Sequence, residues 1–378
     1  MLKNAWYCAA LSNELEEGAV VGRKLLGQRL AFFRTSSGAV HAVAAVCPHR
    51  GADLGWGRVV GDTLQCPLHG WRFDASGRCV HVPSQPAELK IPPKAKCQKF
   101  EVREQQGVIW LWAGDAGLDV PPPPRHEEWD DGPGRARYFE PSRLWACSFV
   151  NAVENAIDTT HIPFIHQETL GAESRSLYPK QALVVDEDLR GFSGRDASDS
   201  PWGAGRKSAV NGKLGKLIVA RLLGLAPVRD EYYRFDLGGS LFYKASYESG
   251  TWDVLVAHST PADSSHTWFF GISIRTRALS WPGERFQRWF SRTLCDEDER
   301  EVSSMLSNDA SLLPHPVSVV GDEPLLTFRR IYQHHLQLQN DLGSTPAAHV
   351  VRSLRTPHLD AGVSRRGADV ANEAEGSL

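Results

Sequence analysis

Cys47-Pro48-His49-Arg50-Gly51-Ala52 and Cys66-Pro67-Leu68-His69-Gly70-Trp71 are the two stretches around which this sequence is organised. Each stretch places a cysteine next to a histidine, as Cys-x-His in the first and Cys-x-x-His in the second, and sixteen residues separate His49 from Cys66. Thiolates and imidazoles at such spacing are metal ligands. The two stretches therefore predict a metal site with two sulfur and two nitrogen ligands.

The ligand set favours an iron–sulfur cluster over zinc. An all-cysteine cluster needs four thiolates, and an all-cysteine zinc site needs a second Cys-x-x-Cys, but each stretch here offers one cysteine. Both thiolates can hold one iron and both imidazoles the other, which gives a [2Fe–2S] cluster that relays single electrons at a raised potential. The alternative is a Cys2His2 zinc site, whose usual order is two cysteines followed by two histidines.

Short β-type runs surround the two stretches and are separated by turn signals such as Ser36-Ser37-Gly38. These runs are Leu30–Phe33, Val40–Val43, Cys79–Val82, Phe100–Val102 and Val108–Trp112. They predict a small all-β unit with the metal motif on two of its loops. Glycines within these loops allow backbone amides to approach a cluster closely.

Length and composition narrow the class of protein. The 378 residues, 42% of them hydrophobic, are enough for two cores, so we expect two domains. The formal net charge of −3 gives no basic field for nucleic acid. No apolar run reaches the roughly 18 residues of a membrane span, and no signal peptide is visible. The seven cysteines do not form a disulfide pattern, so we expect a protein of the reducing cytoplasm.

The second half of the chain predicts an α+β domain. The four prolines Pro121–Pro124 indicate a stiff connector between the two domains. Hairpin signals between Tyr232 and Ile274 predict an antiparallel sheet, and a helical period begins at Pro282. The segment 202–225 is partly amphipathic, and we expect a helix or lid over the active site, with contact to a membrane or partner as the alternative.

A second group of candidate ligands lies in Asn155-x-x-Asp158-x-x-His161-x-x-x-x-His166. Steps of three place the first three residues along one side of a helix, and Pro163 is expected to break that helix and let His166 turn back. Two histidines placed in this way fit the 2-His-1-carboxylate triad of non-haem Fe(II) enzymes.

The third ligand must be an acid from another part of the chain, and Cys295–Glu301 offers several. Asp298 falls on a predicted apolar stripe of the late helix, and an acid that points into a core is costly unless it is paired or bound to metal. We expect Asp298 to be the ligand, with Asp296 as the second choice. The stripe consists of Phe286, Phe290, Leu294, Val302 and Leu306.

The two cysteine–histidine stretches resemble those of the Rieske family, in its oxygenase branch. Rieske subunits of respiratory complexes carry an extra cysteine in each loop, whereas this chain has Ala52 and Leu68 there. The segment from Val153 to His166 is similar to the mononuclear-iron segment of Rieske non-haem oxygenases, and Glu297-Asp298 matches their late carboxylate.

The resemblance implies an N-terminal all-β Rieske domain (1–118) and a catalytic domain (119–355) with a helix-grip-like antiparallel sheet flanked by helices. A tail at 356–378 is expected to be disordered. The cluster ligands would be Cys47, His49, Cys66 and His69, and His161, His166 and Asp298 would hold the mononuclear Fe(II).

Asn155 and Asp158 are the residues expected to serve catalysis beside these ligands. The resemblance implies that Asp158 links the iron's histidine to His69 of another copy, which requires a homo-oligomer, typically a homotrimer. A carboxylate that orients a ligating imidazole gives this role a physical basis. The alternative is that Asp158 only caps a helix.

The implied function is that of a terminal oxygenase component of the vanillate demethylase, dicamba monooxygenase and pheophorbide a oxygenase type. It would use O2 to hydroxylate or demethylate an aromatic, heterocyclic or polycyclic small molecule. The chain has no plant-type ferredoxin motif and no Gly-x-Gly-x-x-Gly, so electrons from NAD(P)H would come through a separate reductase, with or without a ferredoxin. Desaturation or oxidative cyclisation is an alternative reaction, and a Rieske electron carrier without oxygenase activity is an alternative class.

Overall fold

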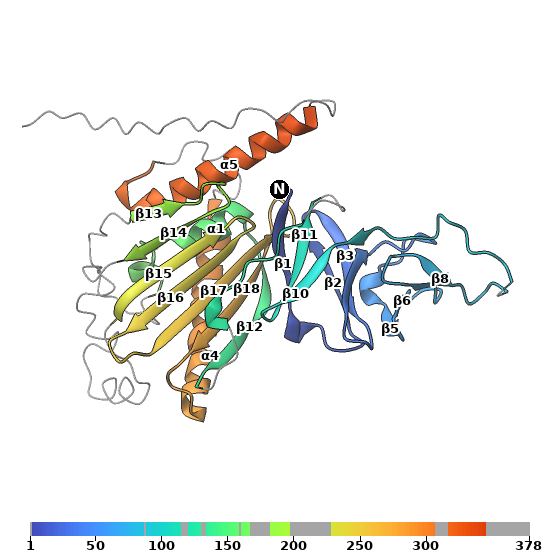
Figure 1. Cartoon of the computed structure of the whole chain (residues 1–378), viewed down its shortest axis with the longest axis horizontal. Helices are drawn as coiled ribbons and strands as arrows, with labels where there is room; N and C mark the ends of the chain where they lie inside the picture. Colours follow the sequence, from blue (N-terminus) through green and yellow to red (C-terminus); the bar gives the residue numbers. More distant parts are fainter. Residues whose placement is uncertain are drawn as a thin grey trace, which may run out of the picture.

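The structure is a computed structural model that describes residues 2–86, 88–114, 120–129, 134–158, 160–166, 182–196, 228–306 and 317–344. Its first part, at the right in Figure 1, is built from three small antiparallel sheets. One sheet has the order β2-β3-β4-β9, with β2 at Val20–Leu25, β3 at Gln28–Arg34, β4 at Val40–Ala44 and β9 at Lys99–Phe100. A second has the order β5-β6-β7-β8, with β5 at Arg58–Val60, β6 at Thr63–Gln65, β7 at Arg72–Phe73 and β8 at Cys79–His81. The third has the order β1-β11-β10, with β1 at Ala5–Leu11, β11 at Val108–Ala113 and β10 at Val102–Gln105.

These strands confirm the expected all-β unit. The predicted runs fall on strands, although the run Phe100–Val102 is divided between β9 and β10, and Val82 follows the end of β8. The two cysteine–histidine stretches lie on loops, the first between β4 and β5 and the second between β6 and β7. A short 3-10 helix at Leu54–Trp56 closes the first loop.

The two loops repeat one hydrogen-bonding pattern. Gly51 donates its backbone N–H to the carbonyl of Cys47 at 2.9 Å, and Gly70 donates to the carbonyl of Cys66 at 3.1 Å. Both glycines have positive φ, 75° for Gly51 and 71° for Gly70, where an L side chain would be strained. The chain therefore turns in the same way after each cysteine.

The second part of the chain is a seven-stranded antiparallel sheet in the order β12-β18-β17-β16-β15-β14-β13. Its strands are β12 at Ala136–Trp145, β13 at Ala182–Val185, β14 at Gly191–Asp196, β15 at Val228–Asp236, β16 at Ser240–Tyr247, β17 at Trp252–Pro261 and β18 at Thr267–Arg275. The strands from β15 to β18 form successive hairpins, as the turn signals predicted. Strand β12 pairs with β18 although it comes first in the chain. It is therefore the edge strand on that side of the sheet, and helix α4 packs beside it.

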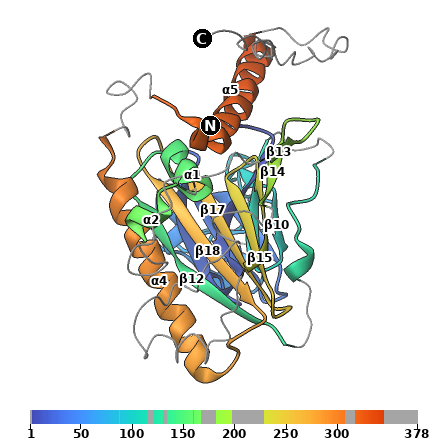
Figure 2. The ribbon, with the colours of Figure 1, turned by 90° about the vertical axis from the view of Figure 1, so that its left-hand side faces the viewer.

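Helices flank this sheet, which confirms the expected α+β class. They are α1 at Phe149–Ile157, α2 at Ile162–Ile165, α4 at Trp281–Ser304 and α5 at Glu323–Ser344, with 3-10 turns at Ser12–Glu14, Glu127–Trp129 and Val320–Asp322. Figure 2 shows α4 running beside β12 and the α1 and α2 pair at one end of the sheet. Among the described helices, none is long and apolar enough to cross a membrane.

The buried face of α4 differs from the predicted stripe. The helix buries Gly283, Ser291, Cys295, Glu297 and Val302. Phe286 and Phe290 are only half-buried, and Leu306 lies beyond the end of the helix with 80% of its surface exposed. The buried face is therefore rotated relative to the predicted stripe and consists mainly of small and polar residues.

The proline-rich connector runs along the first part of the chain without regular structure from Val120 to His126. Prolines donate no backbone hydrogen bond, but their carbonyls accept them. Trp6 Nε1 donates to the Pro121 carbonyl at 2.7 Å, and Gln105 Nε2 donates to that of Pro124 at 2.9 Å. The connector is therefore fixed to β1 and to the end of β10.

The two parts of the chain share their cores through strand β1. Leu2, Ala5 and Tyr7 pack with residues that include Trp145 and Phe149, whereas Trp6, Cys8 and Leu11 pack with the opposite face of the large sheet. All seven residues of β1 are buried.

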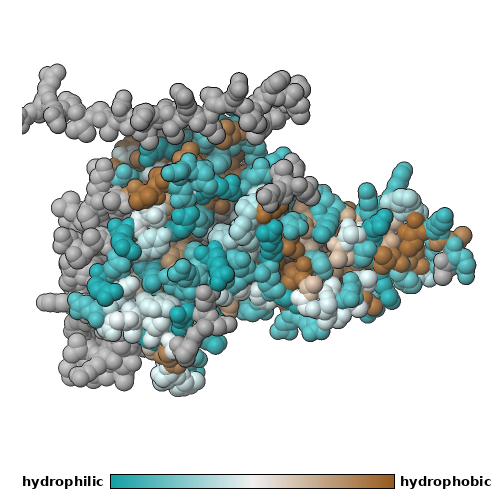
Figure 3. All heavy atoms as spheres, in the orientation of Figure 1, coloured by the Kyte–Doolittle hydropathy of each residue, from teal (hydrophilic) through white to brown (hydrophobic). Residues whose placement is uncertain are grey.

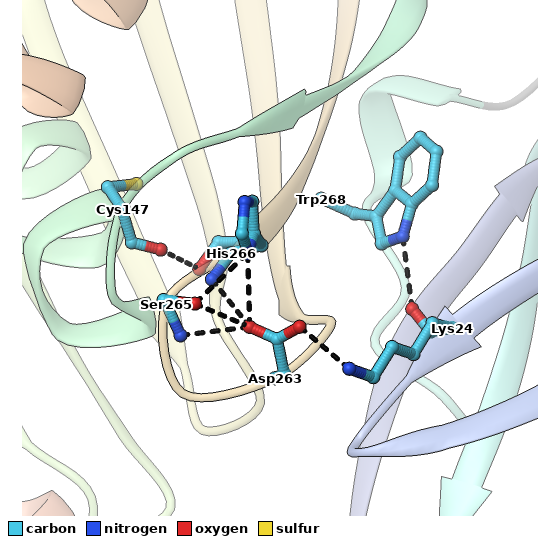
Figure 4. Close-up of polar contacts among 7 residues, drawn as sticks. Lys24, Cys147, Asp263, Ser265, His266 and Trp268 are labelled. Atoms are coloured by element: carbon cyan, nitrogen blue, oxygen red, sulfur yellow. Dashed lines mark hydrogen bonds and ion pairs between the residues drawn. The ribbon is translucent and has the colours of Figure 1, made fainter.

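The turn between β17 and β18 also joins the two parts (Figure 4). Asp263 Oδ2 accepts a hydrogen bond from Lys24 Nζ at 2.8 Å, and Oδ1 accepts backbone N–H groups two and three residues later, both at 2.9 Å. On the other side, Thr267 Oγ1 donates to the carbonyl of Cys147 at 3.0 Å, just before α1 begins. The turn thus connects the first part of the chain with the start of the helix that carries Asn155 and Asp158.

The segment 202–225, the proposed division between residues 118 and 119, and the tail 356–378 lie outside the described residues.

Candidate metal centres

The first candidate centre is formed by the two cysteine–histidine loops. Cys47 and Cys66 are each 2% exposed. Burial raises the pKa of the Cys47 thiol to about 11, while backbone N–H groups of His49 and Arg50 act to lower it. These amides are the donors that a cluster thiolate requires.

The two histidines of this centre lie side by side. Their ring centroids are 4.6 Å apart, and His49 stacks on Trp71 at 4.4 Å. His49 Nδ1 is buried and has no hydrogen-bond partner among the described residues, whereas His69 is exposed. A buried ring nitrogen without a partner fits a metal ligand, because an unsatisfied polar atom is otherwise costly.

The ligand set of the first centre suits two irons. Each loop supplies one thiol and one imidazole, so both thiols can hold one iron of a [2Fe–2S] cluster and both imidazoles the other.

The other five cysteines are buried and unpaired, as expected. Cys79 and Cys97 belong to the same core as the cluster cysteines. Burial, together with the neighbouring thiols, raises the pKa of Cys97 to about 12, so these thiols are unreactive packing groups.

The second candidate centre begins at helix α1. The Ser148 hydroxyl accepts a hydrogen bond from the Asn151 N–H at 3.2 Å and starts the helix, which ends at the C-cap Asp158. Pro163 does not end this helix, as the sequence had suggested. It lies in the first turn of α2, where a backbone N–H has no partner within the helix and its loss costs nothing. Helix α1 therefore ends at Asp158, and His166 follows the last residue of α2.

The structure brings His161, His166 and Asp298 together, with ligand atoms that all lie within 4.8 Å of one another. His166 Nε2 is 3.2 Å from His161 Nε2 and 3.1 Å from Asp298 Oδ1. His161 Nε2 is 3.8 Å from the same oxygen. Two imidazole nitrogens and one carboxylate oxygen that converge in this way fit one metal ion of the facial-triad type.

Asp296 lies apart from this group. Its carboxylate forms an ion pair with Arg143 on β12 and is 53% exposed. Arg143 also forms ion pairs with Glu140 of its own strand at 2.8 Å and with Glu299 of α4 at 3.3 Å. Of the two acids considered, Asp298 is the one at the histidines.

Neighbouring side chains hold the candidate ligands in place. Asn155 Nδ2 donates to Asp298 Oδ1 at 3.0 Å. Asp158 Oδ1 accepts from the N–H and hydroxyl of Thr160 at 2.6 and 2.7 Å, which leaves Oδ2 at 3.6 Å from His161 Nδ1. Burial opposes ionisation, but His161 and Thr160 together lower the pKa of Asp158.

Glu297 is the residue of this centre to which sequence reasoning gave no role. Its Oε2 lies 2.8 Å from His166 Nδ1, and both side chains are buried. Burial acts to lower the pKa of His166, but Asp298 and Glu297 outweigh burial and raise it. The adjacency of Glu297 to Asp298 was the available signal, but its partner is 131 residues away.

Helix α5 supports α1 behind the centre. Arg329 binds Glu154 with two hydrogen bonds, one of them 2.8 Å from Nη2 to Oε2. Phe328 packs edge-on against Phe149 at the start of α1, with ring centroids 6.4 Å apart. Helix α5 therefore holds α1 at its start, through Phe149, and near its end, through Glu154.

The first part of the chain has two cysteine–histidine loops suited to an iron–sulfur cluster. The second part has an antiparallel sheet whose flanking helices bring two histidines and one carboxylate together. These two features define the class of Rieske non-haem iron proteins. Residues 5–102 match the family described as "Rieske [2Fe-2S] domain", and residues 145–337 match "Vanillate O-demethylase oxygenase C-terminal domain". The chain belongs to the Rieske oxygenases with this catalytic domain.

Similar proteins agree with this membership. The vanillate O-demethylase oxygenase subunit of Pseudomonas sp. strain HR199 is 28% identical over 71% of this chain and 75% of its own length. Protein TIC 55 of Arabidopsis thaliana, a chloroplast protein, is 30% identical over 53% of this chain and 37% of its own length. The structure of NdmA from Pseudomonas putida CBB5 with caffeine has a TM-score of 0.75 and 25% identity, and the match covers 89% of this chain and 92% of NdmA. The chain spans about half or less of the length of several other curated relatives, such as 49% of chloroacetanilide N-alkylformylase from Rhizorhabdus wittichii.

Proposed function

We propose that this chain is a terminal oxygenase component. In this proposal Cys47, His49, Cys66 and His69 hold a [2Fe–2S] cluster, and His161, His166 and Asp298 hold one Fe(II). The observation that carries the proposal is the convergence of these three ligand atoms within 4.8 Å in a chain that also has the cluster loops. A pure electron carrier has no need of a second ligand set.

When bound, the cluster supplies single electrons, and the ferrous ion supplies O2 activation with coordination positions left open by the three protein ligands. The protein's own groups set the geometry. Asn155 holds one oxygen of Asp298, and Asp158 stands behind His161 at 3.6 Å. The proposed two-domain division, 1–118 and 119–355, assigns one metal centre to each domain.

We propose an aromatic or heteroaromatic small molecule as the substrate, hydroxylated or oxidatively demethylated. Support comes from the names of relatives, which include vanillate O-demethylase and dicamba O-demethylase oxygenase components. The NdmA structure contains caffeine, a heteroaromatic compound.

The proposed electron source is a separate NAD(P)H-dependent reductase, with or without a ferredoxin. Relatives named as an oxygenase "component" or "subunit" belong to systems with more than one protein, which supports this assignment. A cytoplasmic location is part of the proposal and is supported by the seven unpaired cysteines.

We further propose a homotrimer in which His69 of one copy faces Asp158 of the next. Within one chain the cluster loops lie at the far end of the first part, well away from α1 (Figure 1). Exposed apolar side chains flank each centre: Val46 and Leu68 are 60% and 58% exposed beside the cluster, and Phe164 is 70% exposed between His161 and His166. Figure 3 shows hydrophobic surface on the end of the first part. Apolar surface of this kind at both centres is suited to burial between copies.

Metal content tests the proposal directly. About three irons per chain are expected, two in the cluster and one at the mononuclear site. Asp298→Ala should lose one iron and keep the cluster's EPR signal, whereas Asp296→Asn should keep all three. Retention of all the iron by Asp298→Ala removes this residue from the ligand set. A substrate screen with a surrogate reductase under labelled O2, read by product mass spectrometry, then identifies the reaction.

A further inference from the structure

Helix α4 contributes a second acid to the mononuclear centre beside the candidate ligand Asp298. Glu297 is 8% exposed at its side chain, and its Oε2 lies 2.8 Å from Nδ1 of His166, whose side chain is 3% exposed. Asp298 Oδ1 lies 3.1 Å from Nε2 of the same ring. Two consecutive residues of one helix thus contact both nitrogens of one imidazole.

The contact at Nδ1 has a chemical consequence. An ionised carboxylate only accepts hydrogen bonds, so a bond to Glu297 requires a proton on Nδ1. Because a neutral imidazole carries one N–H, its Nε2 lone pair is then available to a metal ion. Glu297 therefore favours the tautomer of His166 that can bind metal, and it holds the ring plane at the same time.

His161 is held differently. Its Nδ1 is buried and has no hydrogen-bond partner among the described residues, and Asp158 Oδ2 lies 3.6 Å away. The two histidines of the centre are thus unequal, since His166 has a close buried partner for its distal nitrogen and His161 does not.

We propose that Glu297 is a positioning residue that fixes the tautomer and orientation of His166 for the mononuclear metal. This inference rests on the proposed function, because it assumes that His166 is an iron ligand. Residues behind metal-bound histidines commonly change metal affinity by about 10- to 100-fold. Because α4 provides both Asp298 and Glu297, a single rigid helix sets one ligand and aims another.

A purely structural role for Glu297 makes a different prediction. A buried carboxylate is costly unless hydrogen-bonded, and His166 could serve only to compensate that cost. A structural role predicts that removing the carboxylate changes folding but not the metal affinity of the folded protein. A positioning role predicts weaker metal binding in protein that is folded and retains its cluster.

The experiment is an anaerobic Fe(II) titration of full-length protein that keeps its cluster but has lost the mononuclear iron to a chelator. Wild-type protein is expected to bind about one Fe(II) per chain. Glu297→Gln, which keeps the size of the side chain but removes its charge, is expected to bind Fe(II) about 10- to 100-fold more weakly. The cluster's EPR signal in each sample reports that the protein is folded.

Asp296→Asn is the matched control, because Asp296 is the preceding acid on the same helix and pairs with Arg143 instead. It is expected to bind Fe(II) as the wild type does. Equal affinity of Glu297→Gln and wild type overturns the inference, and so does equal weakening by both variants. If Glu297→Gln does not accumulate with its cluster, Glu297→Asp decides: weaker Fe(II) binding supports positioning, and wild-type affinity refutes it. Failure of the wild type to bind Fe(II) contradicts the proposed function and not the role of Glu297 within it.

Discussion

His258 makes the junction between the two parts of the chain sensitive to acid. This histidine on β17 is 2% exposed, its Nδ1 lies 2.9 Å from Ser240 Oγ, and its ring meets the edge of Trp110 on β11 at 5.0 Å. Burial, with a smaller contribution from the nearby His126, lowers the pKa of His258 from 6.5 to about 3. We predict that His258→Gln removes most of this site's contribution to the pH dependence of stability.

Proton linkage gives the size of the change in unfolding free energy with pH. The folded-state pKa is depressed, so the stabilising contribution is complete above pH 6.5 and is lost as pH falls from 6.5 towards 3. In that window the unfolded chain binds a proton that the folded chain does not, at about 1.4 kcal/mol per pH unit. At about pH 5 the loss of unfolding free energy is about 2 kcal/mol, which for a chain of this length lowers the midpoint of thermal unfolding by about 2 to 3 °C.

The assay compares unfolding at about pH 7.5 and about pH 5 for wild type and His258→Gln, followed by tryptophan fluorescence. The drop in unfolding free energy between the two pH values should be about 2 kcal/mol smaller in the variant. His81→Gln serves as the control, since His81 is exposed on β8. His126, whose pKa burial lowers to about 4, still titrates in both proteins and cancels in the comparison. An unchanged drop in His258→Gln refutes the reasoning.

Two further predictions concern the metal centres. Asn155→Ala removes the 3.0 Å hydrogen bond to Asp298 Oδ1 and should weaken Fe(II) binding about tenfold or more, because a bond to a charged group contributes about 1.5 to 3 kcal/mol; unaltered affinity in an Fe(II) titration contradicts this. Gly51→Ala places a side chain at φ 75° with no atom within 4 Å of the new Cβ. The loss of folding free energy, about 1–2 kcal/mol, therefore comes from backbone conformation alone and destabilises the cluster loop. Gly38→Ala, at φ 84° in an equally open turn, should cost the same without faster loss of the cluster's absorbance on warming.

Local sequence patterns predicted the parts of this molecule that depend on short-range chemistry. The cysteine–histidine spacing indicated two loops, and the structure turns both in the same way at Gly51 and Gly70. The turn signals between residues 232 and 274 predicted the hairpins of the large sheet correctly. Asp298 was selected by helical periodicity, and it does lie at the two histidines.

Contacts across long sequence separations escaped the same reasoning. The predicted stripe of α4 assumed that large apolar residues face the sheet, but the helix buries Gly283, Ser291 and Cys295 and leaves Phe286 half-exposed. Pro163 was read as a helix breaker because a proline inside a helical pattern usually ends it, whereas here it begins a new turn. The partner of Glu297 could not be predicted at all, since neither periodicity nor spacing relates residues 131 positions apart.

Strand β1 has a consequence for how this chain is made on the ribosome. The strand is synthesised well before its later partners, since its Cys8 carbonyl accepts a hydrogen bond from Thr260, 252 positions further along the chain. Gly238 passes so close to the Trp6 carbonyl that an added Cβ would lie 2.2 Å from its oxygen. A nascent chain that has completed only the cluster loops therefore still presents an uncovered apolar strand, and chaperones that shield such segments can cover it until the large sheet has been made.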